Sequence, residues 1–163
     1  MLIRNPGRVT TLNAVKPGTL FSVKFDGAMC IALAIEPLSN QPNPDALLLS
    51  PGHPDLHGSP GVLAHSRLIA NSIFAFNDAA IEYLPGTGSI KLGELNIPNS
   101  KKPLYLCDET PYIKFTSQTL GNKTVNLLTG TLEDADLNRA AAIFGWRIVW
   151  TDSRGDAHQI CSF

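Results

Sequence analysis

The sequence predicts a mainly β fold, an antiparallel barrel or sandwich of short strands with one helix near residues 132–144. Many short segments place apolar residues at every second position, the spacing that turns one set of side chains toward a buried face of a strand. Thirteen glycines and twelve prolines separate these segments, and such residues form the turns of all-β proteins. A single stretch combines a helix-start pattern with good helix formers. These observations define the expected fold class.

The first half of the chain contains a clear hairpin. Phe21, Val23 and Phe25 fall at alternate positions, and Asp26-Gly27 after them is a strong two-residue turn signal. The segment 28–36 is apolar at consecutive positions, so we expect a central strand that is covered on both faces. Strands are expected in this half over residues 8–12, 19–25, 28–36, 46–49, 67–76 and 79–84.

The second half of the chain ends in another hairpin. Trp146, Ile148 and Trp150 fall at alternate positions on one face, and residues 152–155 then predict a turn. Strands are expected in this half over residues 89–93, 104–107, 112–116, 123–128, 146–150 and 157–163.

The predicted helix occupies the region near residues 132–144. Residues 131–134 resemble a capping box with the shorter acid, because a threonine is followed three residues later by an aspartate. Residues 136–144 are good helix formers, and Gly145 is placed to end the helix. The acids of the first turn, Glu133 among them, would then meet the helix dipole and need no catalytic role.

Length and composition predict one β-rich domain over residues 1–163. A chain of this length falls in the usual size range of one domain, and no repeat or composition break marks a second. Hydrophobic residues make up 44% of the chain and charged residues 17%, so it can bury a core but has fewer charges than an average domain. The low share of charge favours a surface that assembles with other protein.

Charge and the N-terminal sequence exclude several classes of partner. The net charge is −1, so no positive field would attract nucleic acid. The N-terminal residues lack the apolar core of a secretory signal, and no apolar run approaches the about 20 residues of a membrane helix. We therefore expect a cytoplasmic protein without a membrane partner. Cys30, Cys107 and Cys161 are widely spaced, which predicts buried thiols rather than disulfides.

The strongest chemical cluster is a histidine-rich loop, residues 53–65. His53, Asp55, His57 and His65 lie within it, and imidazole and carboxylate groups are common ligands of zinc. Pro54 argues against a helix that would align His53 and His57, so the spacing sets no ligand geometry. A metal-binding protein or a metal-dependent enzyme, with a divalent metal such as zinc, is one hypothesis for the function.

Two further hypotheses follow from the remaining residues. Trp146 and Trp150 could contact a partner, since large aromatic residues often form the centre of protein interfaces. No catalytic or nucleotide motif accompanies them, which favours a module that is not an enzyme and needs no cofactor. The preferred hypothesis is a binding or assembly module whose partner is a protein, foremost a second copy of itself. The other is a β-barrel that binds a small molecule.

Overall fold

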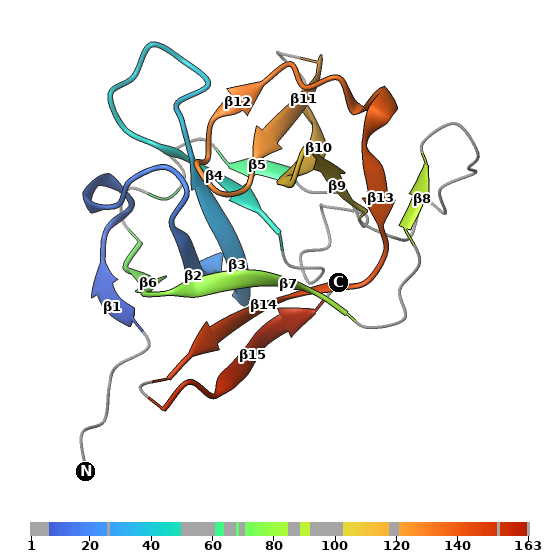
Figure 1. Ribbon diagram of the computed structural model, residues 1–163. Coiled ribbons are helices and arrows are strands. Elements are labelled where there is room, and N and C mark those ends of the chain that lie inside the picture. The colour runs from blue at the N-terminus through green and yellow to red at the C-terminus, as the bar shows by residue number, and fades with distance from the viewer. Residues whose placement is uncertain are drawn as a thin grey trace.

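The fold is mainly β and consists of antiparallel, sandwich-like sheets (Figure 1). The first sheet has the strand order β1-β6-β2-β3-β4-β5, the second β12-β11-β10-β9-β13-β8 and the third β15-β14-β7. The described strands form open sheets, so the sandwich alternative is confirmed and these strands do not close into a barrel. The computed structural model describes residues 7–25, 27–49, 61–63, 68, 71–84, 89–91, 103–117, 121–152 and 154–162.

Most strands lie where the alternation of apolar residues predicts them. The strands are β1 (Gly7–Thr10), β2 (Leu20–Phe25), β3 (Ala28–Ile35), β4 (Asp45–Leu48), β5 (Gly61–Leu63), β6 (Ile73–Phe76), β7 (Ala79–Tyr83), β8 (Ser89–Lys91), β9 (Leu104–Cys107), β10 (Thr110–Ser117), β11 (Gly121–Asn126), β12 (Leu132–Glu133), β13 (Ala141–Ile143), β14 (Trp146–Thr151) and β15 (Ala157–Ser162). The hairpin of β2 and β3 is confirmed, with Phe25 paired to Ala28 and Gly27 at a φ of +85°. The hairpin of β14 and β15 is confirmed too.

Strand β3 is covered on both faces, as its continuous apolar sequence predicts. Cys30, Ala32 and Ala34 pack in one hydrophobic cluster with the alternate residues of β2. Leu33 and Ile35 point to the other side, into a second cluster. Sheet layers bury both faces of a strand only where other elements lie on each side, so β3 is the centre of the first sheet in packing as well as in strand order.

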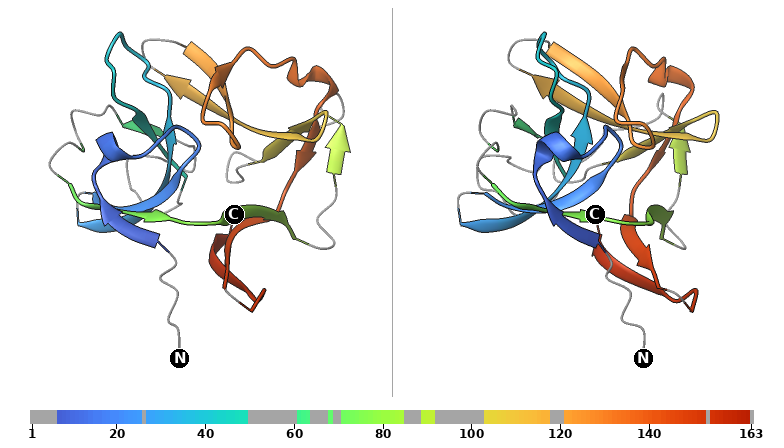
Figure 2. Two further views of the ribbon diagram at one scale, coloured as in Figure 1. Left: turned by 60° about the vertical axis from the view of Figure 1, so that its left-hand side comes forward. Right: turned by 90° about the vertical axis from the view of Figure 1, so that its left-hand side faces the viewer.

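The second cluster is the core that the three sheets share. It contains Leu33 from the first sheet, Ile113 and Phe115 from the second, and Trp146 and Ile148 from the third. In Figures 1 and 2 the third sheet lies below the other two, where its inner face closes this core. That residues 1–163 form one domain stays a prediction.

The prediction of a helix near residues 132–144 is wrong. Residues 132–133 form β12, a 3₁₀ turn follows at Leu137–Arg139, and residues 141–143 form β13. Strand β13 pairs with β9 on one side and with β8 on the other, so every residue of it gains cross-strand partners. Helix propensity amounts to tenths of a kcal/mol per residue, and tertiary pairing overrides it. No helix in the described part of the chain is long and apolar enough to cross a membrane.

The segment between β12 and β13 crosses the outer face of the second sheet. Its residues Leu137 and Ala140 pack with Tyr105 and Tyr112, which stand on that face. Because β12 and β13 are separated by three strands of the sheet, the chain has to pass over β11, β10 and β9. The leucine and alanines that favoured a helix pack instead against the tyrosines on the outer face of the second sheet.

Candidate functional site

The four residues proposed as metal ligands lie outside the described residues. His53, Asp55, His57 and His65 all fall in the part of the chain whose placement is not described. Within the described part, no group of three or more His, Cys, Asp or Glu side chains could hold a metal ion. Metal binding by the histidine-rich loop therefore stays a prediction, which elemental analysis of the purified protein tests.

The two tryptophans proposed to bind a partner have different surroundings. Trp146 is fully buried in the core that the three sheets share. Trp150 lies further along β14 and is half-buried, opposite Ala79 at the first residue of β7. Only Trp150 of this pair therefore has side-chain surface that a partner could reach. A contact between either tryptophan and a partner stays a prediction.

Strands β14 and β15 form a hairpin that extends past the strand on which it packs. The pairing of β14 with β7 ends at Trp150 and Ala79, whereas its pairing with β15 continues to Thr151 and Ala157. The hairpin, drawn in red, projects away from the other two sheets in Figures 1 and 2. Its last residues, 151–157, thus reach beyond the end of β7.

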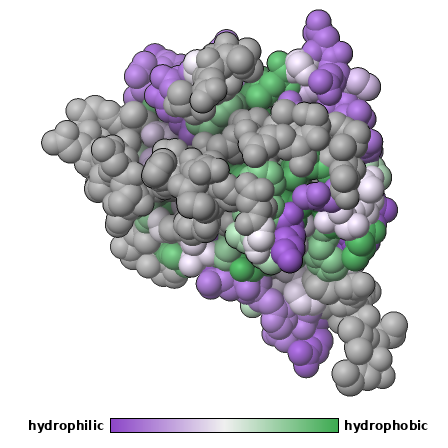
Figure 3. All heavy atoms as spheres, turned by 180° about the vertical axis from the view of Figure 1, so that it is seen from behind, coloured by the Kyte–Doolittle hydropathy of each residue, from purple (hydrophilic) through white to green (hydrophobic). Residues whose placement is uncertain are grey.

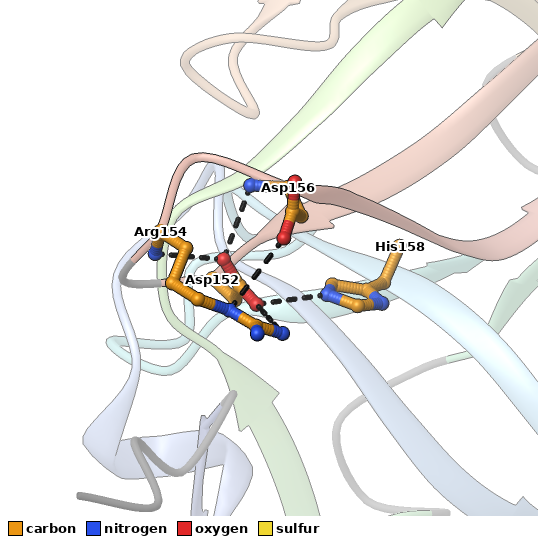
Figure 4. A network of polar contacts seen from close by, with 4 residues as sticks. All are labelled: Asp152, Arg154, Asp156 and His158. Atoms are coloured by element: carbon orange, nitrogen blue, oxygen red, sulfur yellow. Dashed lines mark hydrogen bonds and ion pairs between the residues drawn. The ribbon is translucent and has the colours of Figure 1, made fainter.

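A network of polar contacts organises the tip of this hairpin (Figure 4). The Oδ1 atom of Asp152 accepts hydrogen bonds from the backbone N–H groups of Arg154, at 2.8 Å, and of Asp156, at 3.1 Å. Its Oδ2 atom lies 3.2 Å from His158 Nε2 and 3.4 Å from Arg154 Nη2. The backbone N–H of Arg154 and the further donors lower the pKa of Asp152 to about 2. The carboxylate is therefore charged at every physiological pH.

An aromatic pair lies beside this charged tip. Trp150 and His158 are paired across the two strands, and their ring centroids are 5.2 Å apart with an angle of 30° between the planes. The side chain of His158 is 50% exposed, whereas that of Asp152 is 13% exposed. Asp152 thus contacts the imidazole of His158, and half of the His158 side chain stays exposed to solvent. Tryptophan and arginine are enriched at the centre of protein interfaces, and here Trp150 and Arg154 project from one hairpin.

The base of the hairpin is tied to β7 by an ion pair. Arg147 donates from Nε and Nη2 to the same oxygen of Glu82, at 3.0 and 2.8 Å. Both side chains are about one third exposed, at 34% and 39%, so the Coulomb energy is modest. The geometry matters more, because it fixes the register of β14 against β7 and so the direction in which the tip points.

The sequence predicted Trp150 and the turn of this site but not His158 or Asp152. The histidine was overlooked because three of the four histidines cluster elsewhere in the chain. Counting outward from the predicted turn at 152–155 would place Trp150 opposite Ala157, whereas the loop is one residue longer in the structure and pairs Trp150 with His158.

A second polar network surrounds Glu133 on the outer side of the second sheet. Its carboxylate accepts hydrogen bonds from Tyr112 Oη at 2.7 Å, Asn126 Nδ2 at 3.0 Å and Thr131 Oγ1 at 2.8 Å. The side-chain amide oxygen of Asn126 in turn accepts from Leu128 N at 3.0 Å. The acid expected to cap a helix therefore holds the 127–131 turn, because its strand pairs with β11. The bond from Tyr112 lowers the pKa of Glu133, which makes it a weak base.

Stability should fall in alkaline solution because of Tyr112. The hydrogen bond to Glu133, with burial, raises the pKa of Tyr112 from 10.0 to about 12. The raised pKa means that its stabilising effect is complete below pH 10.0 and is lost as the pH rises through about 12. We expect Tyr112→Phe to flatten the fall in the free energy of unfolding over this range, as measured by urea titrations. The same alkaline slope in both proteins would contradict the assignment.

A shallow groove lies next to this second network. It has a volume of about 240 Å³ and is lined by residues of β10, β11 and the crossing segment, among them Lys114, Thr124 and Asp134. Pockets for small molecules usually measure about 300–1,000 Å³ and are mostly apolar. This groove is smaller and carries charged side chains, so it gives little support to the small-molecule hypothesis.

The described cysteines have the character of inert thiols. Cys30 is buried, Cys107 and Cys161 are half-buried, and none of the three forms a disulfide. Burial raises the pKa of Cys161 to about 11, so its reactive thiolate form is scarce at neutral pH. Cys30 therefore fits the expectation of a buried thiol, whereas Cys107 and Cys161 are partly exposed.

The exposed large hydrophobic residues of the described surface are spread over several segments. Figure 3 shows both polar and apolar residues among the coloured atoms of the face seen from behind. The exposed large hydrophobic residues come from three strands and the turn after β11, and they are Val9, Met29, Tyr83 and Leu128. Single exposed hydrophobic residues are normal on soluble domains. The hairpin tip is therefore the described part of the surface on which aromatic and charged groups are organised together.

No curated family, relative or template guides the choice between these features. Comparison with protein-family models, with curated proteins and with solved structures finds no match for this chain. The hairpin of β14 and β15 brings Trp150, Asp152, Arg154 and His158 together at one end of the third sheet.

Proposed function

We propose that this chain is a protein-binding module that associates with a second copy of itself through the hairpin of β14 and β15. The observation that carries the proposal is the organised tip of a hairpin that extends past β7. Trp150 is half-buried there, and Arg154 and Asp156 have side chains that are 78% and 64% exposed. Ordering an exposed loop costs conformational entropy, and these exposed residues add little buried surface to the core. A partner that binds the hairpin would account for the ordered tip.

The chemistry of the tip suits a protein partner better than a small ligand. The Trp150–His158 pair offers a partly exposed aromatic surface on the strands of the hairpin, and Asp152 contacts His158 and the backbone N–H groups of the turn. An ordered surface of this kind suits a protein partner, because little side-chain freedom is left to lose on association. The low share of charged residues, 17%, also fits a chain that assembles.

Replacing Trp150 by alanine should weaken self-association. We expect wild-type protein to change from monomer to dimer over a concentration series in sedimentation velocity, and Trp150→Ala to raise the dimer dissociation constant at least about tenfold, as for an interface hot spot. The matched control is Met29→Ala, which removes a side chain that is 65% exposed on β3. Circular dichroism establishes that both variants remain folded.

Two results would overturn the proposal. One is a wild-type chain that stays monomeric at the highest concentration reached. The other is an effect of Met29→Ala that equals or exceeds that of Trp150→Ala, because association would then run through the first sheet rather than through the hairpin.

A further inference from the structure

We propose that two copies join edge to edge through β15, in antiparallel orientation, around a two-fold axis that passes between their Gln159 residues. The inference rests on the proposed self-association and names its geometry. The outcome would be one continuous sheet with the order β7-β14-β15 followed by β15, β14 and β7 of the second copy. Closed dimers with a two-fold axis are the commonest protein assemblies.

The first support is the length of the free edge. Strand β15 has six residues and is the last strand of the third sheet. The end strands of the other two sheets have four residues in β1, three in β5, two in β12 and three in β8. Folded proteins keep edge strands short because unpaired N–H and C=O groups on a long edge recruit another strand. Strand β7, at the other edge of the third sheet, has five residues, so β15 is the longest of the described edges.

The second support is the sequence of that edge. Residues 157–162 contain no lysine and no proline, the two residue types that most often prevent edge pairing. Residues 157–159 are exposed, so nothing in the described chain packs over them. One irregularity is present, because the pairing with β14 skips Ile160 between Gln159 and Cys161. A bulge increases the local twist and works against edge pairing; in this arrangement Ile160 of each copy lies opposite His158 of the other.

When a strand pairs antiparallel with its own copy, the two-fold axis passes between the two copies of one residue, which then lie opposite each other. With the axis at Gln159, the two copies of this residue lie opposite each other, His158 lies opposite Ile160, and Ala157 lies opposite Cys161. Gln159 is exposed and uncharged, so its copies can exchange amide hydrogen bonds without repulsion. A centre at the neighbouring residue, His158, would instead place the two imidazole rings opposite each other and move Gln159 off the axis.

The charges of the tip favour this orientation over a contact between the two tips. Each tip carries Asp152 and Asp156 against the single cation of Arg154, so two tips in contact would bring like charges together. In the antiparallel arrangement Ala157, the first residue of β15, lies two residues from the axis, so its two copies are about 14 Å apart at roughly 3.4 Å per residue. Arg154 belongs to the turn beyond Ala157, so the two tips are separated by more than the Debye length of about 8 Å at physiological ionic strength.

Disulfide trapping tests the geometry. Residues that face each other across antiparallel strands have Cα atoms within the 4.4–6.8 Å that a disulfide spans. In a buffer of oxidised and reduced glutathione, we expect Gln159→Cys to form a covalent dimer and Arg154→Cys to form at least about tenfold less. Wild-type protein, which contains the three native thiols, gives the baseline for both.

A charge variant gives an independent readout. Gln159→Lys would place two ammonium groups opposite each other at the axis, and like charges in that position destabilise pairing. We expect it to raise the dimer dissociation constant at least tenfold, with Gln159→Ser as the uncharged control.

The outcomes separate this geometry from the proposed function. A dimer in sedimentation that neither crosslinks through Gln159→Cys nor weakens with Gln159→Lys would overturn edge pairing and leave hairpin association standing. Faster crosslinking of Arg154→Cys would overturn it in favour of contact between the tips. A monomeric wild type would remove the proposed function and the geometry together.

Discussion

Replacing Gly130 by alanine should lower the free energy of unfolding by about 3 kcal/mol, the sum expected for a left-handed backbone and an overpacked contact. Gly130 has a φ of +72°, and a Cβ atom there would lie 2.3 Å from Gly18 N and 2.5 Å from Ala34 O. Both neighbours are backbone atoms, so neither can rotate away. Gly130 also donates a backbone hydrogen bond to Asn126 O at 2.8 Å and accepts one from Glu36 N at 2.9 Å.

Gly27 provides the matched control for this substitution. It has a φ of +85°, similar to that of Gly130, but a Cβ atom there would meet nothing within 4 Å. Gly27→Ala should therefore cost only the backbone strain, about 1 kcal/mol. Urea unfolding of the two variants measures the difference. Equal losses would mean that the close approach of the 127–131 turn to Gly18 and Ala34 contributes nothing to stability.

Replacing Glu133 by alanine should cost about 3 kcal/mol, because a buried donor without an acceptor costs about 1–3 kcal/mol. Two of the three side-chain donors that it satisfies, Tyr112 and Asn126, belong to residues that are only 9% and 8% exposed. Glutamine at this position keeps one acceptor oxygen, so Glu133→Gln should lose less than Glu133→Ala. Denaturant unfolding at neutral pH gives the three values.

The adjacent acid tests whether this loss is specific to the network. Asp134 pairs with Lys123 at 3.2 Å, but its side chain is 88% exposed. Exposed ion pairs contribute about 0–1 kcal/mol, so Asp134→Ala should be nearly neutral. A loss for Asp134→Ala that equals the loss for Glu133→Ala would show that removing any acid near β12 is enough, and would refute the role of the buried donors.

Local patterns predicted most strands and both hairpins because the information lies within a few residues. The dipeptide Asp26-Gly27 by itself indicates a two-residue hairpin turn. The alternate positions of Phe21, Val23 and Phe25 predict that these three side chains lie on one face of the strand. The continuous apolar run 28–36 could be interpreted correctly as well, since a strand with no polar face has to be covered on both sides.

The segment near residues 132–144 could not be predicted in this way, because its partners are distant in sequence. Ala142 lies between Ile90 of β8 and Tyr105 of β9 in the second sheet. Nothing in the residues next to Ala142 indicates those partners, whereas the helix propensity of its neighbours is visible at once. Local propensity was therefore the only signal available, and it is weaker than a two-sided strand pairing.

The candidate site likewise combines features that local sequence predicts with contacts between residues distant in sequence. Trp150 and the turn at its end follow from local sequence, but the choice of Trp150 over Trp146 depends on burial in a core that three sheets build together. The network of Glu133 depends on β11 and β12 meeting Tyr112 of β10. Such contacts join residues that only the folded chain brings within hydrogen-bond distance.

The position of β7 affects the order in which strands can pair during synthesis of the chain. Strand β6 belongs to the first sheet and β7, two residues later, to the third, where its partner is β14. During synthesis on the ribosome, β7 emerges long before β14, and pairings between distant segments form slowly. The nascent chain therefore carries a strand without its partner until β14 has left the exit tunnel, and this is the stage at which chaperones would protect it most.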